Sequence, residues 1–277
     1  MSDAAQPRIA APDPFHQPRR EIAFRGGGFA PQRKRWASWA AFVAVVALWQ
    51  AAISFRVVSP VFLPSPWNIL VAWYGLAVSG ELWANLSASL ARIAAGWTIG
   101  TACGLAVGVA MGLFSIARSV ALPVVSALFP IPKIALLPLL ILWLGIGEPP
   151  KVAVIALGVF FPTVINTFSG VDGVPRNLIR MAQSFDVPFA AIVRKVVLPG
   201  ALPGIIAGFR ISTSIALLLV VAAEMIGAQE GIGAFVLSAG NLMQTDQLMA
   251  GVATLSLLGL GIGALLSALE RRLLRWR

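Results

Sequence analysis

Charged residues are scarce in this chain of 277 residues, of which 12% are charged and 58% are hydrophobic. An ordinary soluble domain carries about 25% charged residues, because it needs them to cover a surface that faces water. The composition therefore excludes an ordinary soluble domain and predicts a polytopic, all-helical membrane protein.

Residue types that build reactive sites are nearly missing as well. The chain has one cysteine, Cys103, inside an apolar run, and one histidine, His16, near its start. This excludes a disulfide framework and a cysteine–histidine metal site. The 11 acidic residues are scattered and form no catalytic arrangement. The P-loop pattern G-x-x-x-x-G-K-S/T does not occur, since the nearest segment, 145–151, has Pro150 in place of the second glycine. We expect no enzyme activity, metal or nucleotide in this chain.

The net charge of +10 raises the possibility of a nucleic-acid partner, but its distribution argues against one. Seven of the 21 basic residues precede Trp36 and four follow Glu270, and most of the others flank apolar runs. This arrangement is typical of membrane proteins, whose cytoplasmic loops are enriched in Lys and Arg. The expected partner of this surface is the lipid bilayer.

Six apolar runs are long enough to cross a bilayer, which takes about 20 helical residues. They are 36–55, 93–117, 119–147 (interrupted by Lys133), 152–171, 204–227 (with Arg210 and Glu224) and 247–269. A further run, 57–80, is broken by Pro60, Pro64 and Pro66. Because Ser65 and Pro66 have the pattern of a helix start, we predict a short helix over 66–80 at the outer interface, with a seventh span as the alternative.

Lys and Arg also predict the orientation. With the N-terminus inside, the inner segments are 1–35, the turn at Arg118, 172–203 and the C-terminal residues from Arg271, and they hold most of the basic residues. Both termini are thus expected in the cytoplasm. Residues 1–35 are rich in Pro, Gly and Arg and are predicted to be a disordered basic tail. Residues 36–277 are predicted to form one six-span domain.

The inner segment 172–203 carries the most informative pattern in the chain. Leu178, Met181, Ala182 and Phe185 recur at helical spacing, residues 186–188 break the helix, and a second apolar face runs from Phe189 to Val197. We predict two short amphipathic helices joined by a tight turn at Asp186. An ordinary basic loop at the inner leaflet is the alternative.

This segment resembles the coupling (EAA) loop of ABC-importer permeases, E-A-A-x-x-x-G followed after nine residues by I-x-L-P. Arg180, Met181 and Ala182 stand at the E-A-A positions, Asp186 at the glycine, and Val196, Leu198 and Pro199 at the ending. The family's acidic residue is thus reversed in charge, and its glycine is an aspartate, which tolerates positive φ better than most residues. The resemblance implies that this loop contacts an ATPase through Arg180, Met181, Ala182, Gln183, Ser184, Asp186, Val187, Pro188, Leu198 and Pro199.

Further motifs resemble the nitrate/sulfonate/taurine branch of these permeases. They are L-P-S-P-W-N at 63–68, S-L-A-R-I-A-A-G-W at 89–97, I-P-K-I-A-L-L-P-L at 131–139, G-I-G-E at 145–148, F-P-T-V-I-N-T at 161–167, A-A-E-M-I-G at 222–227 and G-I-G at 231–233. The resemblance implies a type I ABC-importer permease fold in the bacterial inner membrane, commonly as a homodimer. It implies an ATPase subunit that holds ATP and Mg, and an extracytoplasmic substrate-binding protein. It leaves the solute open between nitrate, sulfonates, taurine and neutral cofactor precursors.

Polar residues inside the runs are candidates for a translocation path, because charges in a bilayer generally face protein or water. They are Lys133, Asn166, Arg210, Ser212, Thr213, Ser214 and Glu224. Arg210 either guides an anionic solute or reaches to the inner headgroups. The three hydroxyl residues either line a polar path or bond to the preceding helical turn. Lys133 follows Pro130 and Pro132, where the helix must be kinked or broken.

Glycines recur every four residues in the second run, at Gly96, Gly100, Gly104, Gly108 and Gly112. Residues four apart share a helix face, and small residues let another helix approach closely. This face predicts either tight packing within the chain or a surface that slides during transport.

Two other functions fit a helical membrane protein with a basic inner loop. One is a secondary transporter driven by an ion gradient, although the chain shows no internal repeat and only one broken helix where that class often has a pair. The other is a non-transporting membrane scaffold that binds a cytoplasmic protein.

Overall fold

The computed structural model describes residues 35–55, 59 and 62–275, and within these residues it contains helices and no strands. The all-helical fold class is confirmed. The tail predicted over 1–35 lies outside the described residues apart from Arg35, which begins α1. The chain forms two compact units, Met1–Leu48 and Trp49–Arg277. Apart from α1, most of which lies in the first unit, the features below belong to the second unit.

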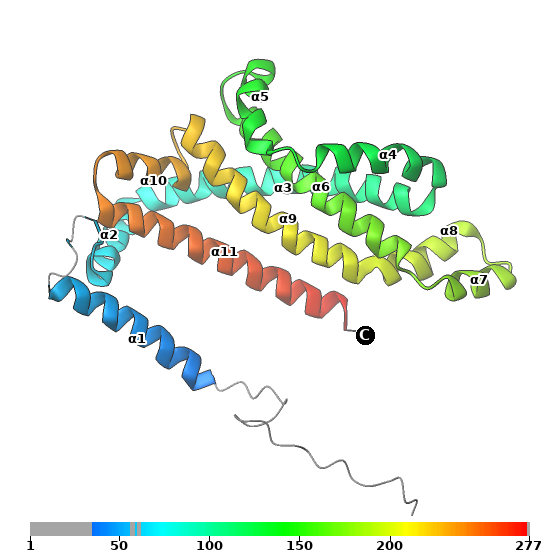
Figure 1. Ribbon diagram of the computed structural model, residues 1–277, viewed down its shortest axis with the longest axis horizontal. Helices are drawn as coiled ribbons and strands as arrows, with labels where there is room; N and C mark the ends of the chain where they lie inside the picture. Colours follow the sequence, from blue (N-terminus) through cyan, green and yellow to red (C-terminus); the bar gives the residue numbers. More distant parts are fainter. Residues whose placement is uncertain (1–34, 56–58, 60–61, 276–277) are drawn as a thin grey trace, which may run out of the picture. The chain divides into compact units, whose positions relative to one another are not determined.

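Helices follow one another with short connections (Figure 1). They are α1 (Arg35–Ser54), α2 (Pro66–Ser79), α3 (Glu81–Leu113), α4 (Ser115–Leu128), the 3₁₀ turn η1 (Lys133–Leu136), α5 (Leu137–Leu144), α6 (Glu148–Asp172), α7 (Arg176–Ser184), α8 (Phe189–Ile192), the π-helical turn η2 (Val193–Val197), α9 (Leu198–Gly227), α10 (Ile232–Asn241) and α11 (Thr245–Leu273).

The short helix predicted over 66–80 is present as α2. The Ser65 hydroxyl accepts a hydrogen bond from the Asn68 N–H at 3.1 Å, and Pro66 is the first helical residue. Gly80 ends the helix at φ 86°, a left-handed conformation that glycine adopts without steric cost. The local sequence signals thus set both ends of α2, while its place at a membrane interface stays a prediction.

Helix α6 is the centre of the second unit, with α3 along one side and α9 along another. The α3 glycines show the direction of packing, because Gly96 lies against Ile155 near the start of α6 and Gly112 lies against Val171 near its end. Helices α3 and α6 are therefore parallel. Their packed residues, together with those of α9, form the main apolar core, which includes Ile93, Val154, Val159, Ala216 and Val220.

Because α3 and α6 are parallel, the chain between them must return from one end of the pair to the other. The return consists of α4 and the η1–α5 segment, which meet at an angle of 88°. The bend falls at Pro130 and Pro132, so the predicted break is confirmed. Lys133 caps it, since its ammonium group donates hydrogen bonds of 2.7–2.8 Å to the carbonyls of Leu128, Phe129 and Ile131.

Four described helices are long and apolar enough to cross a membrane, namely α3, α6, the joined α8–α9 helix and α11. The bent α4–α5 pair gives a fifth if it is one span, and Trp39–Ser54 of α1 is a shorter apolar helix. The predicted number of six therefore stays a prediction. The helix bounds differ from those of the apolar runs, since α3 extends over Glu81–Leu113 where the run covers 93–117.

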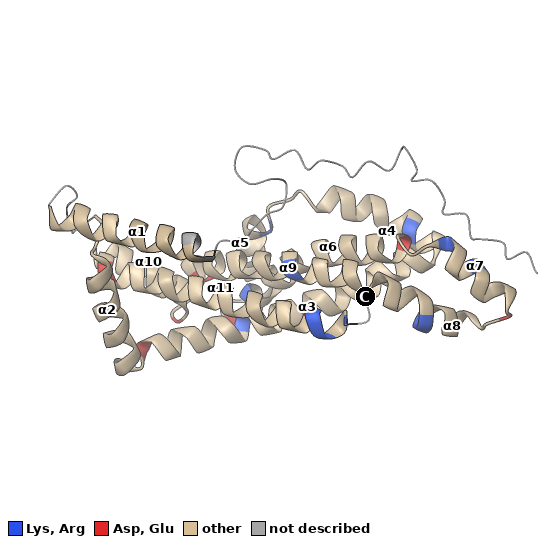
Figure 2. Ribbon diagram, turned by 90° about the horizontal axis from the view of Figure 1, so that it is seen from below, with Lys and Arg blue, Asp and Glu red and all other residues tan. Residues whose placement is uncertain are grey.

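Long uncharged stretches run along α3 after Arg92, along α6 after Lys151 and along α11 before Glu270, whereas Arg210 lies near the middle of α9 (Figure 2). The end of α11 lies toward the same end of the bundle as α7 and α8, because Glu270 pairs with Arg210 in the first half of α9 (Figure 1). The opposite end contains α10 and the starts of α3 and α6 (Figure 1). We call these the α7 end and the Arg92 end.

Candidate functional site

At the α7 end, segment 172–203 folds as a helix, a tight turn and a second helix. Asp186 is in the turn at φ 53°, the left-handed conformation that its place in the motif predicts. The turn is closed by the N–H of Val187, which donates to the Ala182 carbonyl at 3.2 Å. The predicted turn is confirmed, and it needs no glycine.

The second helix of this segment does not end where we predicted. It begins at Phe189 and continues through the π turn into α9, so that Phe189–Gly227 is one helix of 39 residues. The π turn comes just before Pro199, which has no N–H to donate, and the Leu198 N–H bonds back to the Val193 carbonyl. The helix absorbs the proline with a local change of hydrogen bonding, so the segment is continuous with the following span.

Helix α7 exposes much of the face that we predicted to pack beneath the bundle. Leu178, Met181 and Phe185 are exposed, and Phe185 retains 76% of its accessible surface. Of the predicted face, Ala182 does pack, and together with Ile179 it contacts a small core that includes Val171, Val197 and Ala201. The predicted contact face was therefore misplaced by about one residue, and α7 presents a row of three apolar side chains to its surroundings.

At the Arg92 end, one buried guanidinium joins three helices and a turn. Arg92 of α3 makes a two-pronged contact with Glu148 at the start of α6, from Nε at 2.5 Å and from Nη2 at 2.8 Å. Its Nη1 donates to Glu224 of α9 at 2.7 Å and to the Glu230 carbonyl before α10 at 2.6 Å. Lys151, one turn into α6, donates to Glu148 at 3.0 Å. Every nitrogen of Arg92 is thus bonded.

The same cluster caps α10. Three successive backbone N–H groups at its start donate to side chains of other helices: Gly231 to Asn85 at 2.9 Å, Ile232 to Ser89 at 2.9 Å, and Gly233 to Glu224 at 2.8 Å. Such groups have no partner within their own helix. Gly231 is at φ 129°, and a Cβ there would lie 2.5 Å from Arg92 Nη1. Glycine is therefore required where α10 meets the guanidinium.

The two carboxylates that hold Arg92 differ in their exposure. The Glu224 side chain is fully buried, and it also accepts the Ser89 hydroxyl at 2.8 Å. The Glu148 side chain is 57% exposed, although its partners Arg92 and Lys151 are buried. Removing one partner of a buried pair costs about 3–5 kcal/mol, whereas solvent-exposed pairs contribute about 0–1 kcal/mol. The Arg92–Glu224 pair is therefore closed off from water, whereas water reaches the Glu148 side of the Arg92–Glu148 pair.

Sequence reasoning missed most of this cluster. We placed Glu224 on a translocation path and counted Arg92 and Lys151 only as charges at the edges of apolar runs. The available signal was in the motifs, since residues 89–97, 145–148, 222–227 and 231–233 all contribute to this one cluster.

Comparisons with known proteins agree with the fold and the motifs. Residues 100–276 match the family described as binding-protein-dependent transport system inner membrane component. The chain belongs to this family. It is therefore an inner-membrane permease subunit, and its several apolar helices make it a multi-pass protein.

Relatives place this permease in the sulfonate and taurine branch. It is 37% identical over 250 residues to the aliphatic sulfonates transport permease protein SsuC of Bacillus subtilis (strain 168), covering 89% of this chain and 91% of that protein. It is 36% identical over 237 residues to the taurine transport system permease protein TauC of Escherichia coli (strain K12), covering 84% and 86%. A chain of the inward-facing MetNI methionine ABC transporter has the same type I fold, with a TM-score of 0.58 at 22% identity over 76% of this permease and 98% of that chain.

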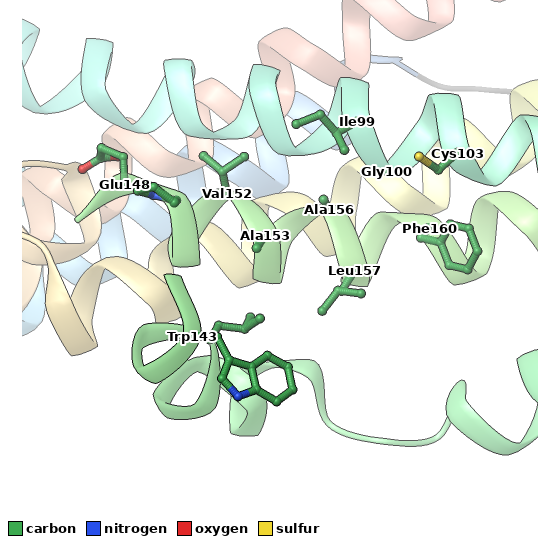
Figure 3. Close-up of a pocket in the computed structure, with 12 residues that line it drawn as sticks. Ile99, Gly100, Cys103, Trp143, Glu148, Val152, Ala153, Ala156, Leu157 and Phe160 are labelled. Carbon is green, nitrogen blue, oxygen red and sulfur yellow. The ribbon is translucent and has the colours of Figure 1, made fainter. Parts of the chain in front are cut away.

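Two cavities of the permease meet at Glu148. An apolar one of about 800 Å³ lies between α3, α5 and α6, with Trp143 facing Ala153 and Leu157 across it (Figure 3). Glu148 is at one end of this cavity, and it is the one charged group among the described residues that line it. A smaller cavity of about 360 Å³ is lined by Arg92, Lys151 and Glu148. Glu148 therefore lines both spaces, and its carboxylate points away from the apolar one (Figure 3).

The other residues that we predicted for a path do not gather into one site in the described structure. Arg210 pairs with Glu270 of α11 at 2.6 Å. Asn166 donates to the Pro162 carbonyl at 2.8 Å within its own helix. Hydroxyls of the α9 group bond to the preceding turn, Ser212 and Thr213 to Phe209 and Ser214 to Arg210. These contacts give each residue a local partner, and a role in translocation stays a prediction.

All five glycines of α3 lie against α6. A Cβ built on Gly96, Gly100, Gly104, Gly108 or Gly112 would fall within 2.9 Å of an α6 atom. The two helices are in such close contact that no side chain fits between them. This geometry favours the first of our two interpretations, tight packing within the chain.

Proposed function

We propose that this permease imports a small organic anion, a sulfonate such as taurine, through a pathway powered by a separate ATPase subunit. The names of its relatives support the solute class, and the missing P-loop requires that nucleotide be bound elsewhere. The observation that best supports an ATPase partner is a row of exposed apolar side chains along α7. Leu178, Met181 and Phe185 are exposed on a short helix that is held to the bundle by a well-packed opposite side.

The proposal includes an orientation and an assembly. The α7 end faces the cytoplasm with the C-terminus, and the Arg92 end faces the substrate-binding protein outside. Two copies of the permease enclose the path. ATP-driven closure of the ATPase pair moves α7, and the 39-residue helix carries this motion to the Arg92 end. The described residues supply motion and a path, while the covalent chemistry of ATP belongs to the partner.

Arg180 and Arg176 give the expected ATPase surface a specific character. Both are exposed on α7 beside the apolar row, and Arg180 stands where the family has an acidic residue. A matching groove on the ATPase is therefore expected to be apolar at its centre and acidic at its rim, because complementary charge sets orientation and excludes wrong partners.

A charge introduced into the apolar row tests this function. In Met181→Glu, a methionine that is 56% exposed gains a carboxylate at the proposed contact. The matched control is Met243→Glu, a methionine that is 75% exposed in the turn after α10, at the opposite end of the permease. We expect an ATPase to co-purify with the wild type and with Met243→Glu, and to be lost from Met181→Glu.

Uptake by cells that lack the gene completes the test. Complementation with the wild type should restore uptake of radiolabelled taurine or of an alkanesulfonate, and this uptake should stop when the co-purified ATPase is inactivated. If uptake continues without the ATPase, an ion-gradient transporter is favoured. If no sulfonate is taken up while the ATPase still binds, the solute class is wrong and the ATPase-driven permease stands.

A further inference from the structure

We propose that Glu148 is the movable arm of a latch that holds the start of α6 to Arg92 in one state of the permease and releases it in another. The proposal rests on the transport function proposed above, and it adds a device that the family name does not imply. It assigns different tasks to the two carboxylates on the same guanidinium.

The Glu224 side of the cluster is built to stay closed. Its carboxylate is fully buried and accepts hydrogen bonds from Ser89, Arg92 and the Gly233 backbone. A Cβ on Gly233 would lie 3.0 Å from this side chain, so little free space surrounds it. Opening this side would leave a buried charge and three donors without partners at once, because α3, α9 and α10 all depend on it.

The Glu148 side is built differently. Its side chain is 57% exposed, so water can replace its bonds to Arg92 and Lys151 as they break. The residue lines two cavities, and the smaller one, which Arg92 and Lys151 also line, gives its side chain room to move. Gly145 at φ 82° and Gly147 at φ 145° come just before it, and glycine changes its backbone angles more easily than other residues.

Release would have one chemical consequence that can be measured. Lys151 is buried, with only 7% of its side chain accessible, and its ammonium group is bonded to Glu148. When Glu148 moves away, Lys151 loses this partner and opens toward the smaller cavity, which it already lines. The latch therefore predicts that Lys151 reacts with a water-soluble reagent in the released state and is protected in the latched state.

The experiment uses the permease with its co-purified ATPase in lipid nanodiscs, where the reagent reaches both faces. A water-soluble amine-reactive ester labels the complex at rest and after trapping with ATP and vanadate, and mass spectrometry measures the modification of each lysine. Lys133 is the internal control, because its ammonium is bonded to three carbonyls of the bend after α4 and not to Glu148. Glu148→Gln is the test variant, and Glu230→Gln, an exposed carboxylate on the same cavity, is its matched control.

We expect Lys151 labelling to rise on the order of tenfold on trapping in the wild type and in Glu230→Gln. The released state is the minor one at rest and the major one after trapping, and a shift of that size raises its population by about this factor. In Glu148→Gln it should be high already at rest, and Lys133 should be unchanged throughout. Labelling that stays at the resting level in trapped wild type overturns the latch, and so does protected Lys151 in Glu148→Gln. In both cases ATP-dependent uptake can persist, so the proposed function survives. A complex without any ATPase overturns both proposals.

Discussion

The unequal exposure of the two glutamates on Arg92 makes a quantitative prediction about stability. Glu224→Gln removes a fully buried charge and leaves the Arg92 guanidinium with a single carboxylate, the exposed Glu148. Loss of a buried partner costs about 3–5 kcal/mol, and because Glu148 continues to compensate Arg92, we expect about 3 kcal/mol. Glu148→Gln removes a charge that water already reaches and leaves Arg92 with the buried Glu224, so we expect a smaller loss than for Glu224→Gln.

The measurement is the free energy of unfolding of the purified permease in mixed micelles, titrated with denaturing detergent and followed by circular dichroism. Glu230→Gln is the control, with an expected change below about 0.5 kcal/mol because its side chain is exposed. Equal losses for Glu224→Gln and Glu148→Gln, or a larger loss for Glu148→Gln, would refute the view that Glu224 is the fixed partner of Arg92 and Glu148 the replaceable one. The latch would then lose its physical basis.

Three further predictions concern other parts of the fold. Gly104→Leu should lower the yield of folded permease and its unfolding free energy by about 3 kcal/mol or more, because even a Cβ would lie 2.8 Å from Thr163; Gly75→Leu, with open space around it, is the control to compare by the same detergent titration. Asp186→Val should destabilise the α7 turn by about 1–2 kcal/mol and weaken ATPase retention, whereas Asp186→Gly should retain the ATPase, because φ is 53° there; equal retention by both variants would contradict this. Phe185→Asp should abolish ATPase binding in a pull-down without lowering the amount of folded permease, since the ring is 76% exposed; a loss of folded protein would mean that the ring stabilises the fold.

The features of this permease that depend only on neighbouring residues could be predicted. The cap of α2, the break before Lys133 and the turn at Asp186 each depend on a few neighbouring residues, and each is present in the structure. The glycine face of α3 was also visible, because a period of four residues marks one side of a helix.

The sequence alone could not show which charged side chains form ion pairs with one another. We ended apolar runs at charged residues, so Arg92 and Lys151 looked like membrane edges, whereas the structure neutralises them with Glu148 and Glu224 and extends α3 to Glu81. The exposed face of α7 was ambiguous for a related reason. Apolar residues occur on neighbouring sides of that helix, and its sequence alone does not say which side meets the bundle.

The length of the Phe189–Gly227 helix has a consequence for where the bilayer ends. At about 1.5 Å per residue its 39 residues extend about 58 Å, nearly twice the hydrocarbon core of about 30 Å. If Gly227 marks one boundary of that core, the other falls close to Arg210, the first basic residue met on the way back. The π turn and the exposed Arg194 and Lys195 then lie among the headgroups and beyond. Water is available there to satisfy an irregular backbone, and the α7 helix is held clear of the lipid.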